Sequence, residues 1–286
     1  MEHKKNQKID ILVTVDENYL EPLKTMLYSL HQNDPQQAFT IWLIHEKIPT
    51  AAVKELREML IGLGSTLEER RVAPELLKGA PTAERYPKEM YFRLLSGAIL
   101  PKTLKKVLYL DPDILVINPL QKLWQTDLEG NMFAAAIHAG MTNLSYRINT
   151  LRLGADRGYF NSGVMLIDLE KARTQVKLQD IYDALAKYKN LLVLPDQDIL
   201  NYLYGRSIKE VPEEIWNYDT RQFLSYLTRS FGKYDTRWTM QHTAILHFCG
   251  KPKPWEEKNG NKFTILYFHY EQMRRRFEAL NKGRMQ

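Results

Sequence analysis

The chain has 286 residues, of which 44% are hydrophobic and 26% charged, so it is long enough for one large globular domain or two small ones. No apolar stretch is long enough for a membrane-spanning helix, the polar residues 1–8 do not resemble a signal peptide, and the single cysteine excludes an internal disulfide. These features favour a reducing, cytoplasmic setting. The net charge of +6 suits anionic partners, but nucleic-acid-binding motifs are absent, so no nucleic-acid partner is expected.

Strands and helices alternate in the first third of the chain. Residues 10–15 and 39–44 are short apolar runs rich in β-branched and aromatic residues, which predicts strands, and 68–72 is a weaker third run. Apolar residues recur at helical spacing after the first strand and again over 51–63. This order predicts an α/β fold whose central sheet is mixed but mostly parallel.

Residues 87–100 are expected to form a third helix, with Pro87 in its first turn. Arg93 lies off the apolar stripe of that helix, so the residues alone favour a solvent-exposed arginine over a binding one. The strand 105–110 follows this helix in the chain.

Two acids, Asp111 and Asp113, end the strand 105–110, with Pro112 between them. Unpaired carboxylates at the end of a buried strand are costly to desolvate, and a divalent cation such as Mn²⁺ or Mg²⁺ removes that cost. A turn rich in aspartate and proline explains the same residues equally well. Because ligands bind beyond the carboxyl ends of strands in open α/β sheets, Asp16 and Asn18, after the first strand, are expected to share a crevice with the acids.

The sequence lacks both glycine-rich phosphate-binding motifs, GxGxxG and GxxxxGK[ST], so dinucleotide-binding and P-loop interpretations are weak. Further strands are expected at 132–137 and 159–167. Asn161, Ser162 and Gly163 interrupt the second of these, which indicates either close approach by a ligand or a β-bulge.

A helix is predicted over 178–188, and Pro195 begins another. Asp196 and Asp198 can act there as first-turn acids that the helix dipole stabilises. The alternative is that Asp196 and Gln197 point into the crevice.

Residues 216–243 look irregular and are candidates for acceptor-side loops. The last strand, 244–248, contains His247, and a lone strand histidine is more often structural than a ligand. Cys249 lies on the same strand face, so a His/Cys metal site and plain packing both remain open. Gly250 would let the backbone approach a phosphate, and Lys253 could neutralise one.

The final element, 263–280, interleaves aromatic residues with arginines. A helix of this kind can lie on an anionic membrane surface. It can equally dock on the domain with its arginines in solvent.

Six motifs, in order along nearly the whole chain, resemble glycosyltransferase family 8, the retaining transferases that include bacterial lipopolysaccharide galactosyl- and glucosyltransferases. The motifs are ILVTVDENY (11–19), YFRLL (91–95), YLDPDILV (109–116), FNSGVMLID (160–168), DQDILN (196–201) and HFCGKPKPW (247–255). The resemblance implies a Rossmann-like, nucleotide-sugar-binding GT-A fold over residues 1–255, followed by a basic aromatic helical segment over 256–286.

The same resemblance implies roles for individual residues. Mn²⁺, or Mg²⁺ as the alternative ion, would be held by Asp111, Asp113 and His247 together with the diphosphate of a UDP-sugar, so that Asp111 also contacts the donor. The residues expected around the uridine are Thr14, Asp16, Asn18 and Tyr19. Those expected around the donor sugar are Arg93, Asn161, Ser162, Asp196 and Gln197, of which Gln197 and Asp196 are the catalytic candidates. Gly250 and Lys253 are expected on the phosphates.

The implied reaction moves galactose or glucose from a UDP-hexose to a glycan or glycolipid acceptor, with retention of configuration. The metal and Lys253 would stabilise the leaving diphosphate. An amide is a poor nucleophile, so attack from the leaving group's own face is favoured over a covalent intermediate on Gln197. The alternatives are a nucleotide-sugar hydrolase and a non-catalytic nucleotide-sugar-binding accessory protein.

Two positions depart from the family pattern. His138 stands where several galactosyltransferases carry an acid, so the acceptor of those relatives cannot be assigned to this chain. Pro112 stands where alanine is common. The expected location is cytoplasmic, with peripheral contact at the inner face of the membrane through the C-terminal helix.

Overall fold

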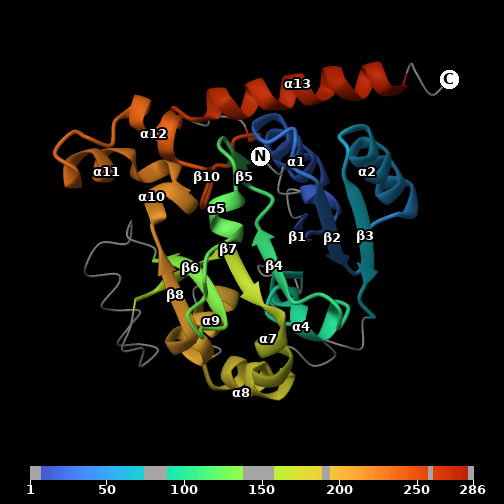
Figure 1. Ribbon diagram of the computed structural model, residues 1–286, viewed down its shortest axis with the longest axis vertical. Helices are drawn as coiled ribbons and strands as arrows, with labels where there is room; N and C mark the ends of the chain where they lie inside the picture. The colour runs from blue at the N-terminus through green and yellow to red at the C-terminus, as the bar shows by residue number, and fades with distance from the viewer. Residues whose placement is uncertain (1–7, 74–88, 138–157, 189–193, 257–259, 283–286) are drawn as a thin grey trace, which may run out of the picture.

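A computed structural model describes residues 8–73, 89–137, 158–188, 194–256 and 260–282 (Figure 1). Its centre is a seven-stranded sheet in the order β3-β2-β1-β4-β7-β6-β8. The strands are β1 Ile9–Thr14, β2 Phe39–His45, β3 Thr66–Arg71, β4 Lys106–Leu110, β6 Phe133–Ile137, β7 Phe160–Asp168 and β8 Ile208–Val211. Only β7 runs antiparallel to its neighbours in this sheet, so the predicted mostly parallel, mixed α/β architecture is confirmed.

Alternating side chains divide the core between the two faces of the sheet. In β1, Ile9, Ile11 and Val13 pack on one face with helices α1 (Leu20–Asn33) and α2 (Thr50–Gly62), whereas Leu12 points to the other. The second face packs against helices α7 Leu169–Gln175, α8 Leu178–Tyr188 and α9 Pro195–Tyr204. This arrangement leaves the carboxyl ends of β1 and β4 side by side at one edge, because those two strands are parallel neighbours.

A second, three-stranded sheet builds onto that edge. It consists of β5 Ile114–Val116, β10 Ile245–His247 and β9 Tyr218–Asp219, in the order β5-β10-β9. β10 pairs antiparallel with β5, which places His247 opposite Ile114. The small sheet therefore joins a segment near the end of the chain to the residues that directly follow β4.

Two predictions of secondary structure are wrong. Residues 89–100 form two short helices, α3 Glu89–Phe92 and α4 Ser96–Ile99, instead of one, and 87–88 lie outside the described residues. Within α4, a Cβ at Gly97 would lie 2.8 Å from the Arg173 backbone nitrogen, so glycine lets α4 approach α7.

The segment 216–243 was expected to be irregular but is largely helical. Its described elements are α10 Glu213–Trp216, β9, a 3₁₀ turn Thr220–Gln222, α11 Phe223–Arg229 and α12 Thr236–His242. Asp235 starts α12 because its side chain accepts a hydrogen bond from the Trp238 backbone nitrogen at 2.7 Å. The remaining short elements among the described residues are a 3₁₀ helix Glu17–Tyr19, α5 Gln121–Trp124 and a 3₁₀ turn Gly205–Ser207.

The C-terminal helix α13 (Thr264–Lys282) lies along α1 at the top of Figure 1. Phe277 packs on Tyr28 with ring centroids 5.7 Å apart, and Arg274 is fully buried in ion pairs with Glu21 and Glu278. The helix is thus docked on the domain. The docking alternative placed the arginines of this helix in solvent, but Arg274 is buried. Within the described residues, no helix is both long and apolar enough to cross a membrane.

Candidate active site

The acids after β4 meet His247 at the junction of the two sheets. His247 Nε2 lies 3.3 Å from an oxygen of Asp113 and 4.0 Å from an oxygen of Asp111, and one ligand atom from each of the three residues lies within 4.8 Å of the others. The Asp111 backbone nitrogen donates to the Gly163 carbonyl at 2.8 Å, which ties the first acid to β7. The two carboxylates and the imidazole are therefore close enough to share one divalent cation.

The surroundings of this cluster fit a metal ion. The Asn161 side-chain oxygen accepts from the Gly163 backbone nitrogen (2.8 Å) and from Asn217 Nδ2 (3.0 Å), which turns the Asn217 oxygen toward His247 Nδ1 at 2.7 Å. His247 therefore carries a proton on Nδ1, and its Nε2 faces the acids, where it is the nitrogen available to a metal ion. Carboxylate oxygens with one imidazole suit Mn²⁺ or Mg²⁺.

Gly163 keeps the space beside the ligands open. A Cβ at this position would lie 2.4 Å from His247 Cε1 and 2.6 Å from an Asp111 carboxylate oxygen. Neither atom can retreat without moving a ligand, so only glycine fits here. Both interpretations that the sequence left open for this strand apply: the pairing of β6 with β7 is irregular here, passing from Ala135 opposite Met165 to Ile137 opposite Phe160, and Gly163 lets the ligand side chains come close.

Lys253 adds a positive charge next to Asp113. Its Nζ is hydrogen-bonded to the Asp113 carboxylate and, at 3.0 Å, to the Phe248 carbonyl. Burial acts to raise the pKa of Asp113, but Lys253 and His247 outweigh it and hold that pKa well below the usual range. Burial raises the pKa of Asp111 in spite of its neighbour Arg93. For His247, burial acts downward, but Cys249 and Asp113 raise its pKa well above the usual imidazole value.

Arg93 is buried at the centre of the site, so the interpretation of a solvent-exposed arginine is wrong. Its Nη1 lies 3.1 Å from Asp111 and 3.4 Å from Asp196 and donates to the Ser162 carbonyl at 3.1 Å. Its guanidinium also stacks 4.5 Å from the centre of the Tyr109 ring. Arg93 lies in the turn between α3 and α4. The expected single helix with one apolar stripe therefore does not describe this segment.

The start of α9 separates the two acids that the sequence could not distinguish. Asp198 is fully buried and accepts hydrogen bonds from Tyr159 (2.6 Å) and the Leu194 backbone nitrogen (3.1 Å), so it stabilises the helix start. Asp196 instead accepts from the Ser162 hydroxyl at 3.0 Å and pairs with Arg93. Asp196 therefore faces the acid cluster.

Gln197 joins the same group of side chains. Its oxygen accepts from the Ser162 backbone nitrogen at 3.4 Å. Its buried amide nitrogen makes no hydrogen bond within the described residues, although Tyr159 lies close by. A buried donor without a firm partner is costly, and a bound ligand would satisfy it.

The predicted uridine-binding residues lie around the end of β1. Asp16 caps the 3₁₀ helix Glu17–Tyr19 by accepting from the Tyr19 backbone nitrogen and from the Asn18 amide, both at 3.2 Å. Thr14 reaches the site through Tyr109, whose hydroxyl is 3.3 Å away. Tyr19 packs edge-on against Trp255, with ring centroids 5.9 Å apart, and burial raises its pKa.

Gly250 has a left-handed backbone, with φ of +69°, and a Cβ there would lie 2.5 Å from an Arg221 nitrogen. Arg221 pairs in turn with the buried Asp219 at 2.7 Å. Within the described part of the chain, the cluster of metal-ligating groups contains the two acids and His247 and does not include Cys249. His138 lies outside the described residues.

Sequence reasoning missed two residues that support the ligands. Tyr109 donates to an oxygen of Asp111 at 2.5 Å. It lies two residues before that acid in a strand, so the two share a face, and this spacing could have identified it. Asn217 gave no such signal, because its contact with His247 depends on the pairing of β9 with β10.

Comparisons with known proteins agree with one another. The sequence model of glycosyl transferase family 8 matches residues 10–259. General stress protein A of Bacillus subtilis (strain 168) is 30% identical over 274 residues, covering 93% of this chain and 94% of that protein. A lipopolysaccharide 1,2-glucosyltransferase of Escherichia coli is 26% identical over 245 residues, covering 85% and 72%. The crystal structure of the galactosyltransferase LgtC with donor and acceptor sugar analogues superimposes with a TM-score of 0.79 at 25% identity, covering 93% of this chain and 96% of LgtC.

Proposed function

Because this chain belongs to glycosyltransferase family 8 and is a glycosyltransferase with a GT-A fold, we propose that it is a retaining hexosyltransferase that uses a UDP-sugar. The family and the fold expected from the six motifs are thereby confirmed. The donor would carry galactose or glucose, and the acceptor would be a glycan or glycolipid. The observation that carries the proposal is the cluster of Asp111, Asp113 and His247, with Lys253 beside it.

Asp111, Asp113 and His247 would hold a divalent ion, Mn²⁺ with Mg²⁺ as the alternative, which when bound supplies a Lewis acid for the leaving diphosphate. Lys253 is a fixed cation at the same position and would neutralise charge that develops on the phosphates. Gly250 would let the backbone come close to them. Thr14, Asp16, Asn18 and Tyr19 would bind the uridine at the end of β1.

Arg93, Ser162 and Asp196 would orient the donor sugar, because their contacts with one another hold their polar groups together. Asn161, whose side chain Asn217 holds, would act beside them. Gln197 would lie at the reacting carbon and stabilise its positive charge. An amide is a weak nucleophile, so the acceptor hydroxyl would attack from the face that the diphosphate leaves, and the leaving phosphate would accept its proton. Isolation of a sugar covalently attached to Gln197 would contradict this mechanism.

The proposal is tested by incubating the protein with UDP-galactose and UDP-glucose, with and without Mn²⁺, and measuring UDP release. We expect release that depends on the metal and rises when an acceptor is added. A hydrolase would release UDP equally fast without an acceptor, and an accessory protein would bind UDP without turnover.

Asp113→Ala should lose metal-dependent UDP binding, and unchanged binding and activity in that variant would rule out the proposed site.

The C-terminal segment, 256–286, would add a peripheral contact with anionic lipid at the cytoplasmic face of the membrane, next to the catalytic unit 1–255. On α13 the exposed side chains include Ile265, Phe268, Arg275 and Arg276. Deletion of the chain from Phe263 onward would also remove the buried Phe263 and Tyr267 from the core, so point variants are the better test. Phe268→Asp combined with Arg275→Glu should abolish sedimentation with phosphatidylglycerol vesicles, and undiminished sedimentation would contradict the contact.

A further inference from the structure

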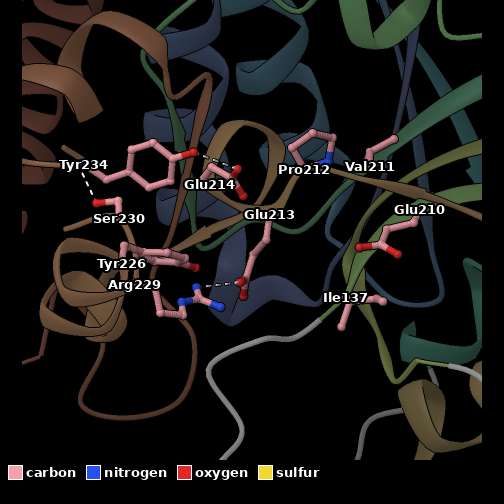
Figure 2. A pocket seen from close by; sticks show the side chains of 10 residues that line it. All are labelled: Ile137, Glu210, Val211, Pro212, Glu213, Glu214, Tyr226, Arg229, Ser230 and Tyr234. Carbon is pink, nitrogen blue, oxygen red and sulfur yellow. Dashed lines mark hydrogen bonds and ion pairs between the residues drawn. The ribbon is translucent and has the colours of Figure 1, made fainter. Parts of the chain in front are cut away.

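A cavity of about 600 Å³ lies between α10, α11 and the ends of β6 and β8 (Figure 2). Its size lies within the roughly 300–1,000 Å³ that is usual for small-molecule sites. Figure 2 shows side chains of α11 and the loop after it on one side and the ends of β6 and β8 on the other, with the first residues of α10 between them. The polar and aromatic residues that characterise the lining are Glu210, Glu213, Glu214, Tyr226, Arg229 and Tyr234.

Two structural links place this cavity next to the proposed reaction centre. Ile137, at the end of β6, pairs with Phe160, the residue before Asn161. The Glu213 carbonyl accepts from the Asn217 backbone nitrogen at 2.9 Å, and Asn217 in turn holds both His247 and Asn161. The cavity wall is therefore linked to Asn161 through the pairing of β6 with β7, and to Asn217 through α10.

The lining combines groups that recognise sugars. Arg229 lies 3.8 Å from the buried Glu213 and 5.1 Å from the centre of the Tyr226 ring, and the Tyr234 hydroxyl donates to Glu214 at 3.5 Å (Figure 2). Carboxylates accept hydrogen bonds from hydroxyl groups, and an arginine donates to them. Tyrosine rings offer apolar faces of the kind that pack against the carbon–hydrogen face of a sugar.

The charge of the lining restricts the class of ligand that can bind. Among the described residues of the lining, three glutamates face one arginine, so this part of the wall carries an excess of negative charge. A phosphate or carboxylate on the ligand would be repelled, because like charges at close range disfavour binding. An uncharged, hydroxyl-rich ligand meets no such penalty.

We propose that this cavity binds an uncharged sugar unit of the acceptor glycan and excludes acceptors that carry an acidic group at that position. The inference rests on the proposed glycosyltransferase function, and it adds the class of acceptor. The bound unit would lie beyond the sugar that receives the hexose, since the described lining includes none of the metal-ligating residues and is linked to Asn161 and Asn217 only through Phe160 and Glu213.

The test is saturation-transfer NMR with the full-length protein, UDP and Mn²⁺. The probes are three neutral disaccharides, lactose, cellobiose and maltose, and digalacturonate as the acidic counterpart. We expect saturation transfer to at least one neutral disaccharide and much weaker transfer to digalacturonate. In Glu210→Lys/Glu214→Lys, neutral binding should weaken roughly tenfold, since charged hydrogen-bond acceptors are lost, and digalacturonate binding should strengthen.

The control is Glu55→Lys/Glu58→Lys, which makes the same change of charge on the exposed side of α2 and should bind like the unmodified protein. If thermal unfolding shows that the lysine pair at the cavity destabilises the fold, Glu210→Lys alone, at an exposed side chain, gives the same readout. The proposal is overturned if no neutral disaccharide binds, if digalacturonate binds equally well, or if the cavity variant matches the control. Metal-dependent UDP binding by the unmodified protein, measured on the same samples, shows separately whether the donor site fails.

Discussion

Arg93 and Arg274 are both buried, but the acids that pair with them lie in different surroundings. Arg93 pairs with Asp111 and Asp196, whose side chains are themselves largely buried. Arg274 pairs with Glu21 and Glu278, whose side chains are 59% and 24% exposed. The first arginine lies in the crevice at the end of the sheet, and the second lies between α1 and α13.

The difference separates charge used for binding from charge used for packing. In the crevice, several buried ions surround one another, and such a cluster gains little folding free energy because desolvation offsets most of the attraction. Clusters of buried charged groups are typical of functional sites, where the charges bind a ligand. At the α13 interface, the arginine stem fills a packed position while its head reaches acids at the surface. We therefore expect changes in the crevice to affect activity and changes at the interface to affect stability.

The largest effect is expected for Arg93→Lys. A lysine keeps the charge but cannot contact Asp111, Asp196 and the Ser162 carbonyl in the same planar geometry. Metal-dependent hexosyl transfer should fall by roughly 100-fold or more, as when one preorganised donor is removed from an active site. The melting temperature should stay close to that of the unmodified protein, and a large drop would show that Arg93 serves folding instead.

The opposite pattern is expected for Arg274→Ala. Loss of this buried ion pair should cost about 3 kcal/mol of unfolding free energy, measured by urea denaturation. The rate of transfer per folded molecule should be retained at low temperature, because Arg274 pairs with Glu21 and Glu278, neither of which contacts the described ligand cluster. Substitution by methionine should recover part of the stability, since it refills the space without a charge.

The sequence predicted the sheet better than the crevice. Strands β1 and β2 have short, β-rich apolar runs that identify them. The paired acids after β4 suggested a ligand site, but the local sequence could not distinguish that site from a turn, and only the resemblance of the six motifs favoured it. Arg93 was misjudged because the expected helix breaks into two short pieces around it. The helices α11 and α12 have only seven residues each, too few for a clear hydrophobic period. The contact of Asn217 with His247 comes from tertiary pairing of strands, which no local pattern contains.

A smaller effect on the crevice side is expected for Gly163→Ala. The added methyl group would press on His247 and Asp111, so the affinity for Mn²⁺ with UDP should fall roughly tenfold in a calorimetric titration. Gly205→Ala is the matched control, because Gly205 has ordinary helical angles and no atom lies within 4 Å of a Cβ there. Equal titrations for the two variants would mean that the ligands do not depend on the space that Gly163 leaves.

The smallest effect concerns pH and tests the packing side of the comparison at His31 on α1. Burial lowers the pKa of His31 to about 4, and its Nε2 makes no hydrogen bond within the described residues, so the folded protein holds this ring neutral against Phe39. The unfolded chain takes up a proton near the ordinary value of 6.5, whereas the folded chain does not, so stability falls as pH drops below that value and continues to fall toward 4. Between about pH 7.5 and about pH 5.5 the loss due to this one residue should be about 1 kcal/mol.

His31→Leu should remove that part of the pH dependence, measured as the difference between urea denaturation curves at the two pH values. Part of the dependence should persist in the variant, because burial also lowers the pKa of His45. His31 lies in the packed layer under the sheet rather than in the crevice, so the pH profile of transfer, normalised to folded protein, should not change. A shift of that profile in His31→Leu would mean that packing and binding are coupled through α1, and the separation drawn from the two arginines would then fail.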